Sequence, residues 1–163
     1  MNKIEIMAPA GSLETLKVAV DCGADAVYLG IGAYNARMNA ENFTIETLME
    51  GCSYAHLRST KVYLTLNTLV NDFEFDDAVS TAIEAYNAGV DSIIIQDIGL
   101  ATKILESNPE IPLTCSTQMN VFSADEISSL AKLGFKRIVL AREVDIEMVK
   151  KIKSLGVEVE VFG

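Results

Sequence analysis

Short apolar runs alternate with amphipathic segments along the whole chain. Four of the runs follow a glycine in similar phrases, which are GADAVYLG (23–30), GVDSIIIQD (89–97), GFKRIVLARE (134–143) and GVEVEVFG (156–163). Each of these glycines ends an amphipathic segment and suits the left-handed position that follows a helix. The apolar runs are short and almost uninterrupted, which is typical of parallel strands covered on both faces.

This pattern predicts a strict alternation of strands and helices. Local start signals support several helices, because Ser123 with Glu126 forms a capping box and Asp145 is a good N-cap. Asn71 with Glu74 resembles a second capping box. We expect strands near 4–8, 26–30, 61–67, 91–96, 111–116, 137–141 and 157–162, and helices near 12–22, 44–57, 72–88, 98–107, 123–133 and 145–155.

Two folds fit this alternation, a doubly wound open sheet and a (β/α)8 barrel that lacks its end. Both have a parallel sheet with right-handed crossovers. A whole barrel takes about 250 residues, whereas the chain has 163. The first strand leads into APAGS and not into the G-x-G-x-x-G turn of a dinucleotide-binding fold. We therefore predict an α/β fold in one domain over 1–163, an incomplete (β/α)8 TIM-type barrel with about seven parallel strands and six helices.

Composition narrows the classes of function. The formal net charge of −10 argues against a broad cationic face, so RNA would have to meet a local patch or another domain. No stretch approaches the roughly 18 apolar residues of a membrane span, and the apolar run at the N-terminus is too short for a secretory signal, so we expect a cytoplasmic protein. Cys22, Cys52 and Cys115 lack CxxC spacing, which predicts small buried side chains and no metal site.

In both folds the active face lies at the carboxyl ends of the strands. The segments that follow the predicted strands are rich in amides, hold two arginines and contain few carboxylates. The lone His56 falls late in a helix, away from this face, and Cys115 falls within a core strand. The candidate substrate-binding residues are Arg37, Asn42, Asn67, Gln118, Asn120, Arg142, Glu143 and Glu160.

Several of these candidates have two interpretations. Arg37 lies in a long loop from 30 to 43 and could clamp a carboxylate or phosphate, or form a surface ion pair with Glu41. Gln118 and Asn120 offer paired donors and acceptors for a planar substrate, or they hold neighbouring loops in register. Arg142 and Glu143 could bind substrate or form a buried salt bridge at the barrel mouth.

The last predicted strand alternates valine with Glu158 and Glu160. A strand buried on both faces does not place charges in this way. Either the two glutamates point into a polar barrel lumen, or the strand is an exposed edge whose charges discourage pairing.

Six segments together resemble the N-terminal part of the peptidase U32 family. They are APAGSLETLKVAVDCGADAVYLG, ARMNAENF, KVYLTLNTLV, QDIG, STQMNV and RIVLARE, in the family's order between residues 4 and 162. The family is named for proteases, including collagenase-like members. Other members resemble oxygen-independent hydroxylases of tRNA wobble uridine, ribosomal RNA cytidine and ubiquinone precursors. The resemblance implies that RNA-modifying members depend on prephenate and that several members hold an iron–sulfur cluster through four cysteines.

The resemblance also places the end of the chain within the family signature E-x-F-x-H-G-A-x-C. Residues 160–163 occupy its first four positions, and none of the three cysteines matches a cluster ligand. We therefore expect a truncated N-terminal barrel portion of a longer U32 protein, inactive by itself. We expect no cofactor in this chain and an iron–sulfur cluster in the full-length protein.

Three functions stay open at this point. The favoured one is an iron–sulfur-dependent hydroxylase of tRNA or rRNA, in which RNA binds only with the missing C-terminal part. Arg37 and Arg142 would then hold prephenate or another small carboxylate. The alternatives are a genuine collagenase-like peptidase, and a non-catalytic scaffold that forms a homo-oligomer through its open barrel edges.

Overall fold

The computed structural model describes residues 4–32, 34–35, 43–153 and 156–162. Within these residues seven strands alternate with six α-helices, and one 3-10 turn, η1, follows the fifth strand. The strands are β1 (Met7–Pro9), β2 (Ala26–Gly30), β3 (Lys61–Leu66), β4 (Ser92–Ile95), β5 (Leu113–Cys115), β6 (Phe135–Val139) and β7 (Glu158–Glu160). The helices are α1 (Leu13–Asp21), α2 (Ile45–His56), α3 (Phe75–Asn87), α4 (Ile98–Ser107), α5 (Ala124–Leu133) and α6 (Ile146–Lys153), and η1 covers Thr117–Met119.

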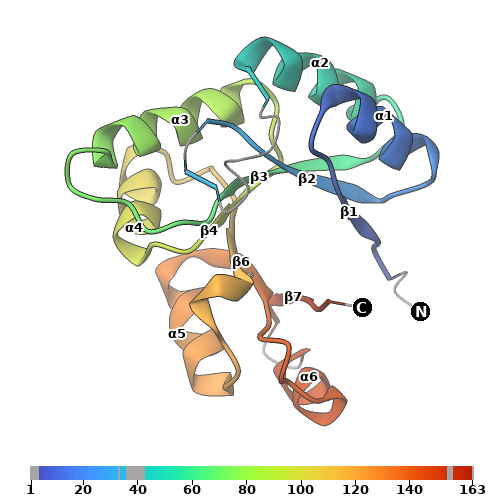
Figure 1. The fold of residues 1–163 in the computed structure, drawn as a ribbon. Helices are drawn as coiled ribbons and strands as arrows, with labels where there is room; N and C mark the ends of the chain where they lie inside the picture. Colours follow the sequence, from blue (N-terminus) through green and yellow to red (C-terminus); the bar gives the residue numbers. More distant parts are fainter. Residues whose placement is uncertain (1–3, 33, 36–42, 154–155, 163) are drawn as a thin grey trace.

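The strands form one parallel sheet in the order β1-β2-β3-β4-β5-β6-β7. The sheet curves into a half-barrel with the helices on its outer side, and β1 and β7 lie at its two ends (Figure 1). The predicted incomplete barrel is therefore confirmed. The open barrel follows from the sequence order itself, because each crossover adds its strand beside the previous one.

The two faces of the sheet have different partners. On the outer face, fully buried residues such as Leu64, Ile93 and Leu113 pack with the helices into the main core. On the inner face, Tyr63 of β3 packs with Ala26 of β2 and Ile94 of β4 in a smaller cluster. Because both faces are covered, the central strands show the nearly continuous apolar runs of the sequence.

Helix starts agree with the sequence signals at two of three positions. The Ser123 and Glu126 capping box begins α5, and the backbone N–H of Met148 donates to the Asp145 carboxylate at 2.8 Å at the start of α6. The expected Asn71 and Glu74 box is wrong. Helix α3 begins at Phe75 without a side-chain cap, because the side chains of Asn71 and Glu74 bond to each other in the preceding turn.

His56 ends α2, as expected, and has a structural partner there. Its Nε2 lies 2.9 Å from Oδ2 of Asp91, which also accepts a hydrogen bond from the backbone N–H of Val62 at 2.7 Å. This contact ties α2 to the amino ends of β3 and β4. None of the helices in the described part of the chain is long and apolar enough to cross a membrane.

Candidate functional site

A pocket of about 260 Å³ opens at the carboxyl ends of the strands. Every strand of the described sheet contributes to its lining, either by its last residues or by the segment that follows. Amides, hydroxyls and apolar groups dominate this lining, with one arginine and one carboxylate. The lining residues are Ala10, Gly11, Tyr28, Leu29, Gly30, Asn35, Thr65, Asn67, Ile94, Ser116, Thr117, Gln118, Val139, Arg142, Glu160 and Phe162.

The structure brings four of the eight candidate residues together in this pocket, namely Asn67, Gln118, Arg142 and Glu160. Asn120 and Glu143 are exposed and stand outside the lining. Arg37 and Asn42 fall outside the described residues.

The loop after β5 is held by its own polar side chains. Ser116 caps η1 by accepting a hydrogen bond from the backbone N–H of Gln118 at 3.2 Å. The hydroxyl of Thr117 donates to the carbonyl of Leu140 at 3.2 Å, which ties this loop to the end of β6. Asn120 ends the turn in the left-handed conformation with φ 54°. The neighbouring loops are thus kept in register by Thr117, while Gln118 belongs to the pocket lining.

Gly30 at the end of β2 makes room for a buried amide. The Asn35 side chain is 1% exposed, and its Nδ2 donates to the carbonyl of Gly32 at 3.1 Å. A Cβ atom at position 30 would lie 2.6–2.8 Å from the Asn35 side-chain atoms, closer than real Cβ contacts come. Both residues line the pocket, so its wall depends on a glycine at this position.

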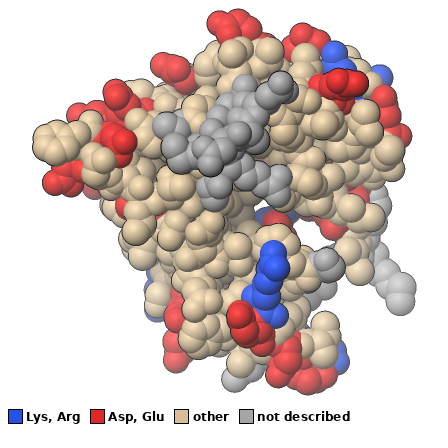
Figure 2. Space-filling view, viewed as in Figure 1, with Lys and Arg blue, Asp and Glu red and all other residues tan. Residues whose placement is uncertain are grey.

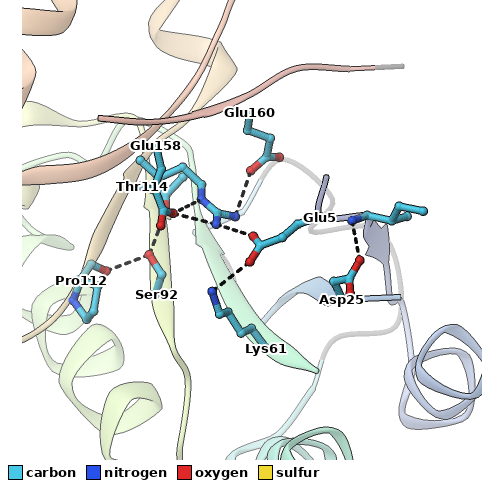
Figure 3. Close-up of polar contacts among 10 residues, drawn as sticks. Glu5, Asp25, Lys61, Ser92, Pro112, Thr114, Glu158 and Glu160 are labelled. Carbon is cyan, nitrogen blue, oxygen red and sulfur yellow. Dashed lines mark hydrogen bonds and ion pairs between the residues drawn. The ribbon is translucent and has the colours of Figure 1, made fainter. Parts of the chain in front are cut away.

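Both glutamates of β7 lie on the lumen face of that strand, although β7 is also the last strand of the described sheet and the Glu158 side chain is 64% exposed. Arg137 of β6 lies on the same face and contacts both glutamates (Figure 3). Arg137 Nε donates to the Glu158 carboxylate at 2.9 Å, and its Nη2 donates to Glu5 at 2.7 Å. The Arg137 side chain is only 9% exposed and also lies over the Tyr63 ring, 5.1 Å from its centroid.

The electrostatics of this lumen differ from one carboxylate to the next. Burial raises the pKa of Glu160, and the nearby Glu5 raises it further, although Arg137 opposes both effects. Burial also acts to raise the pKa of Glu5, but hydrogen bonds from Arg137 and Lys61 outweigh it and lower the pKa. The Glu160 side chain, 22% exposed, is therefore the carboxyl of this group that is costly to ionise.

Arg137 was not among the residues singled out from the sequence. Its position in FKRIV, two residues before the inward-facing Val139, is the signal that could have identified it. A cation that points inward from a buried strand needs a carboxylate partner, and the alternating glutamates of β7 provide it.

Arg142 and Glu143 do not form the buried salt bridge that was one of their interpretations. Both side chains are exposed. The Arg142 guanidinium instead lies over the ring of Phe162, 4.7 Å from its centroid, at the mouth of the pocket. Among the cations of the described residues, Arg142 is the one in the pocket lining.

The cysteines present do not fit an iron–sulfur cluster. Burial raises the pKa of both Cys52 and Cys115 to about 12, which keeps them as thiols, whereas a cluster needs thiolates. Cys22 is exposed and stands apart on α1's C-terminal side. No group of three potential metal ligands occurs within the described ranges 4–32, 34–35, 43–153 and 156–162.

Comparison with known protein families identifies the family of the chain. The family model "Peptidase family U32" matches residues 11–163. The chain belongs to this family. A U32 protein of known structure, the U32 peptidase Mk0906, superposes with a TM-score of 0.72 over 99% of the chain and 68% of that protein at 14% identity. A dihydrodipicolinate synthase from Agrobacterium tumefaciens gives a TM-score of 0.65 over 96% of the chain and 63% of that protein at 16% identity. These two likenesses concern the fold.

U32 relatives with higher sequence identity carry two kinds of name. The tRNA hydroxylation protein P of Helicobacter pylori (strain 26695) is 38% identical over 172 aligned residues, which cover 100% of the chain and 40% of the relative. The 23S rRNA 5-hydroxycytidine C2501 synthase of Escherichia coli is 36% identical over 93% of the chain and 22% of its own length. A collagenase of Porphyromonas gingivalis is 34% identical over 100% of the chain and 39% of its own length. The chain thus spans 22–40% of the length of these relatives.

Proposed function

We propose that this chain forms the barrel part of a U32 protein that hydroxylates RNA, with a pyrimidine of tRNA or rRNA as its target. The observation that carries the proposal is 38% identity to a tRNA hydroxylation protein across the whole chain. The similarity to a 5-hydroxycytidine synthase supports the same type of modification. The pocket also suits a small polar ring, because amides and hydroxyls line it together with aromatic side chains.

The redox part of this activity is assigned to iron–sulfur chemistry outside this chain. The family resemblance suggests a cluster held by cysteines, but Cys52 and Cys115 are buried thiols with raised pKa values. The residues of this chain therefore contribute binding and orientation of the substrate in the proposed function.

RNA contacts beyond the target base are also assigned to other parts of the protein. On the face seen in Figure 2, acidic side chains gather over the outer helices and basic ones are few, in line with the net charge of −10. Because phosphate binding requires clustered Lys and Arg, the main RNA-binding surface belongs to a further domain in this proposal.

Arg142 is the proposed anchor for a small carboxylate such as prephenate. It is exposed at the pocket mouth, and its guanidinium can bind a carboxylate through two parallel hydrogen bonds. The affinity of the longer protein for prephenate should fall at least about tenfold in Arg142→Ala. Unchanged affinity would remove Arg142 from this role.

The direct test of the proposed function is nucleoside analysis. In a strain that lacks the gene for this chain, mass spectrometry of digested tRNA and rRNA should show the loss of a hydroxylated pyrimidine, which the intact gene restores. An unchanged nucleoside profile would refute the proposal.

A collagenase-like peptidase is the second candidate, because the collagenase of Porphyromonas gingivalis is 34% identical across the chain. Two results together would favour this candidate over RNA hydroxylation. The purified longer protein would cleave denatured collagen, and the deletion strain would keep a normal nucleoside profile.

A homo-oligomer through the open barrel edges is a further proposal. Ile4 and Ile6 beside β1, and Val161 beside β7, are exposed apolar side chains at the two ends of the sheet. Such edges favour pairing with another chain. Sedimentation of the chain should show a dimer or larger species, and a single monomeric species would argue against it.

A further inference from the structure

The carboxylate of Glu160 lacks the hydrogen bonds that a buried charged group needs. Its Oε2 is buried and has no hydrogen-bond partner among the described residues. The nearest cation is Arg137, whose Nη1 lies 3.8 Å away, too far for a hydrogen bond. The neighbouring Glu5 and Glu158 carboxylates each accept a hydrogen bond at 2.9 Å or less. Glu160 lines the pocket and its side chain is 22% exposed, so its carboxylate keeps acceptor capacity for a molecule that enters.

Arg137 directs its hydrogen bonds at the other two carboxylates and not at Glu160, from which its Nη1 lies 3.8 Å away. Its Nε and Nη2 are already directed at Glu158, and Nη2 also donates to Glu5 (Figure 3). The guanidinium of Arg137 also lies over the Tyr63 ring, 5.1 Å from its centroid. Arg137 thus holds Glu160 in place by charge and leaves the hydrogen-bonding capacity of that carboxylate to the pocket.

The pocket has two charged side chains, and they differ in burial. The Glu160 side chain is 22% exposed and lies near Arg137, whereas Arg142 is exposed and stacks on Phe162. A second anionic group beside Glu160 would be repelled by it. A group with an N–H donor and no negative charge is favoured there.

The size and lining of the pocket favour one small planar ring. About 260 Å³ is below the roughly 300–1,000 Å³ typical of sites for drug-sized ligands. Tyr28 and Phe162 offer aromatic surface, and Asn67 and Gln118 offer amide groups around it. Aromatic stacking together with polar contacts to the ring edge is the usual way in which proteins bind a single extruded base.

We propose that Glu160 is the residue that recognises the target base, by accepting a hydrogen bond from an N–H group on the Watson–Crick edge of a pyrimidine in this pocket. Uracil offers its N3–H and cytosine its N4 amino group, so one carboxylate serves both bases. This inference rests on the proposed RNA hydroxylation and assigns the recognition step to a single side chain of this chain.

The test uses two nucleosides that differ in this donor. The chain is titrated at pH 7 with uridine and with 3-methyluridine, which lacks the N3–H, and binding is followed by NMR chemical shifts. Uridine should bind at least about tenfold more tightly than 3-methyluridine. Equal affinities, or no binding of uridine, would overturn the proposal.

Two variants separate recognition from a general effect of the lumen charges. Glu160→Met removes the acceptor and should bring the ratio of the two affinities to about one. Glu158→Met is the matched control, because Glu158 lies on the same strand and contacts Arg137 but does not line the pocket. It should keep the ratio of the wild type. A ratio that persists in Glu160→Met would assign the selectivity to another residue.

The binding test and the nucleoside analysis can fail separately, so they test the role of Glu160 and the proposed hydroxylation independently. If hydroxylated nucleosides disappear in the deletion strain while the chain does not distinguish the two ligands, RNA hydroxylation stands and the role of Glu160 is refuted. If the chain prefers uridine while the nucleoside profile of the strain is unchanged, Glu160 is a base-binding residue and the proposed hydroxylation is refuted.

Discussion

Arg137 on β6 donates a hydrogen bond of 2.7 Å to Glu5, which precedes β1, although the two residues are 132 positions apart in the chain. Glu5 precedes the strand at one end of the sheet, and β6 neighbours the strand at the other end (Figure 1), so this contact joins both sides of the half-barrel. Glu5 also pairs with Lys61 of β3 at 3.2 Å. One group of lumen side chains therefore joins the beginning, the middle and the end of the fold.

The loss of this arginine should weaken the fold. Arg137→Met removes the hydrogen bonds to Glu5 and Glu158 and leaves Glu5 with Lys61 alone, so the free energy of unfolding should fall by about 2 kcal/mol. Urea denaturation followed by circular dichroism measures it. Arg142→Met is the control, because this exposed side chain has no carboxylate partner among the described residues and should change stability by less than about 0.5 kcal/mol. Equal effects would show that the lumen group does not support the fold.

Glu160 and Glu5 should affect stability with opposite dependence on pH. A carboxyl whose pKa is raised on folding favours the folded state at low pH, and this contribution is lost as pH rises through the folded pKa. Burial raises the pKa of Glu160, so Glu160→Gln should be more stable than the wild type at pH 7, and the difference should vanish below about pH 4. Thermal unfolding from pH 3 to 8 tests this.

Glu5 provides the opposite case. Its pKa is lowered against the effect of burial by hydrogen bonds from Arg137 and Lys61, so its contribution is present at neutral pH and is lost as pH falls through the folded pKa. Glu5→Gln should therefore be less stable than the wild type at pH 7 and similar to it in acid. Parallel pH profiles for the two variants would contradict the assigned pKa directions.

The pocket wall should be sensitive to one of its two lining glycines. Gly30→Ala places a Cβ within 2.8 Å of the buried Asn35 side chain and should cost about 1–3 kcal/mol. Gly11→Ala is the matched control, since a Cβ there has open space, and should stay within about 0.5 kcal/mol. Urea denaturation compares the two variants. A larger effect at position 11 than at position 30 would contradict the described packing.

The order of elements could be predicted because it depends on local patterns. Runs such as SIII and KVYLTL indicate strands buried on both faces, and the Ser123 and Glu126 signal marks the start of α5. The Asn71 and Glu74 signal failed because the same side chains can bond to each other before the helix begins. The local sequence alone does not show whether this pair caps the helix or bonds in the turn before it.

The lumen group could not be predicted in this way. Arg137 reads as an ordinary charged residue in its strand, and its role depends on Glu5 and Glu158, which the fold brings together from distant positions. The position of the pocket could be predicted from the sequence, because the carboxyl ends of the strands in a parallel sheet meet at one edge. Asn120 was expected there too, but the left-handed turn at this residue leaves it outside the lining.

The thiols should differ strongly in reactivity. Cys52 and Cys115 are buried, with pKa values raised to about 12, and should resist alkylation by iodoacetamide at pH 8 until the chain unfolds. The exposed Cys22 should react in the native state. Mass spectrometry of the alkylated protein shows which sites react. Rapid alkylation of Cys115 in the folded chain would contradict its described burial.

The central claim, that the pocket above Arg137 binds the base in an RNA-hydroxylating protein, is tested most directly in the deletion strain. The strain is complemented with the wild-type gene, Glu160→Met or Glu158→Met at equal protein levels, and the hydroxylated pyrimidines of tRNA and rRNA are measured by mass spectrometry. We expect hydroxylation to be restored by the wild type and by Glu158→Met, and to stay below about one tenth of that level with Glu160→Met. Full hydroxylation with Glu160→Met would contradict the claim.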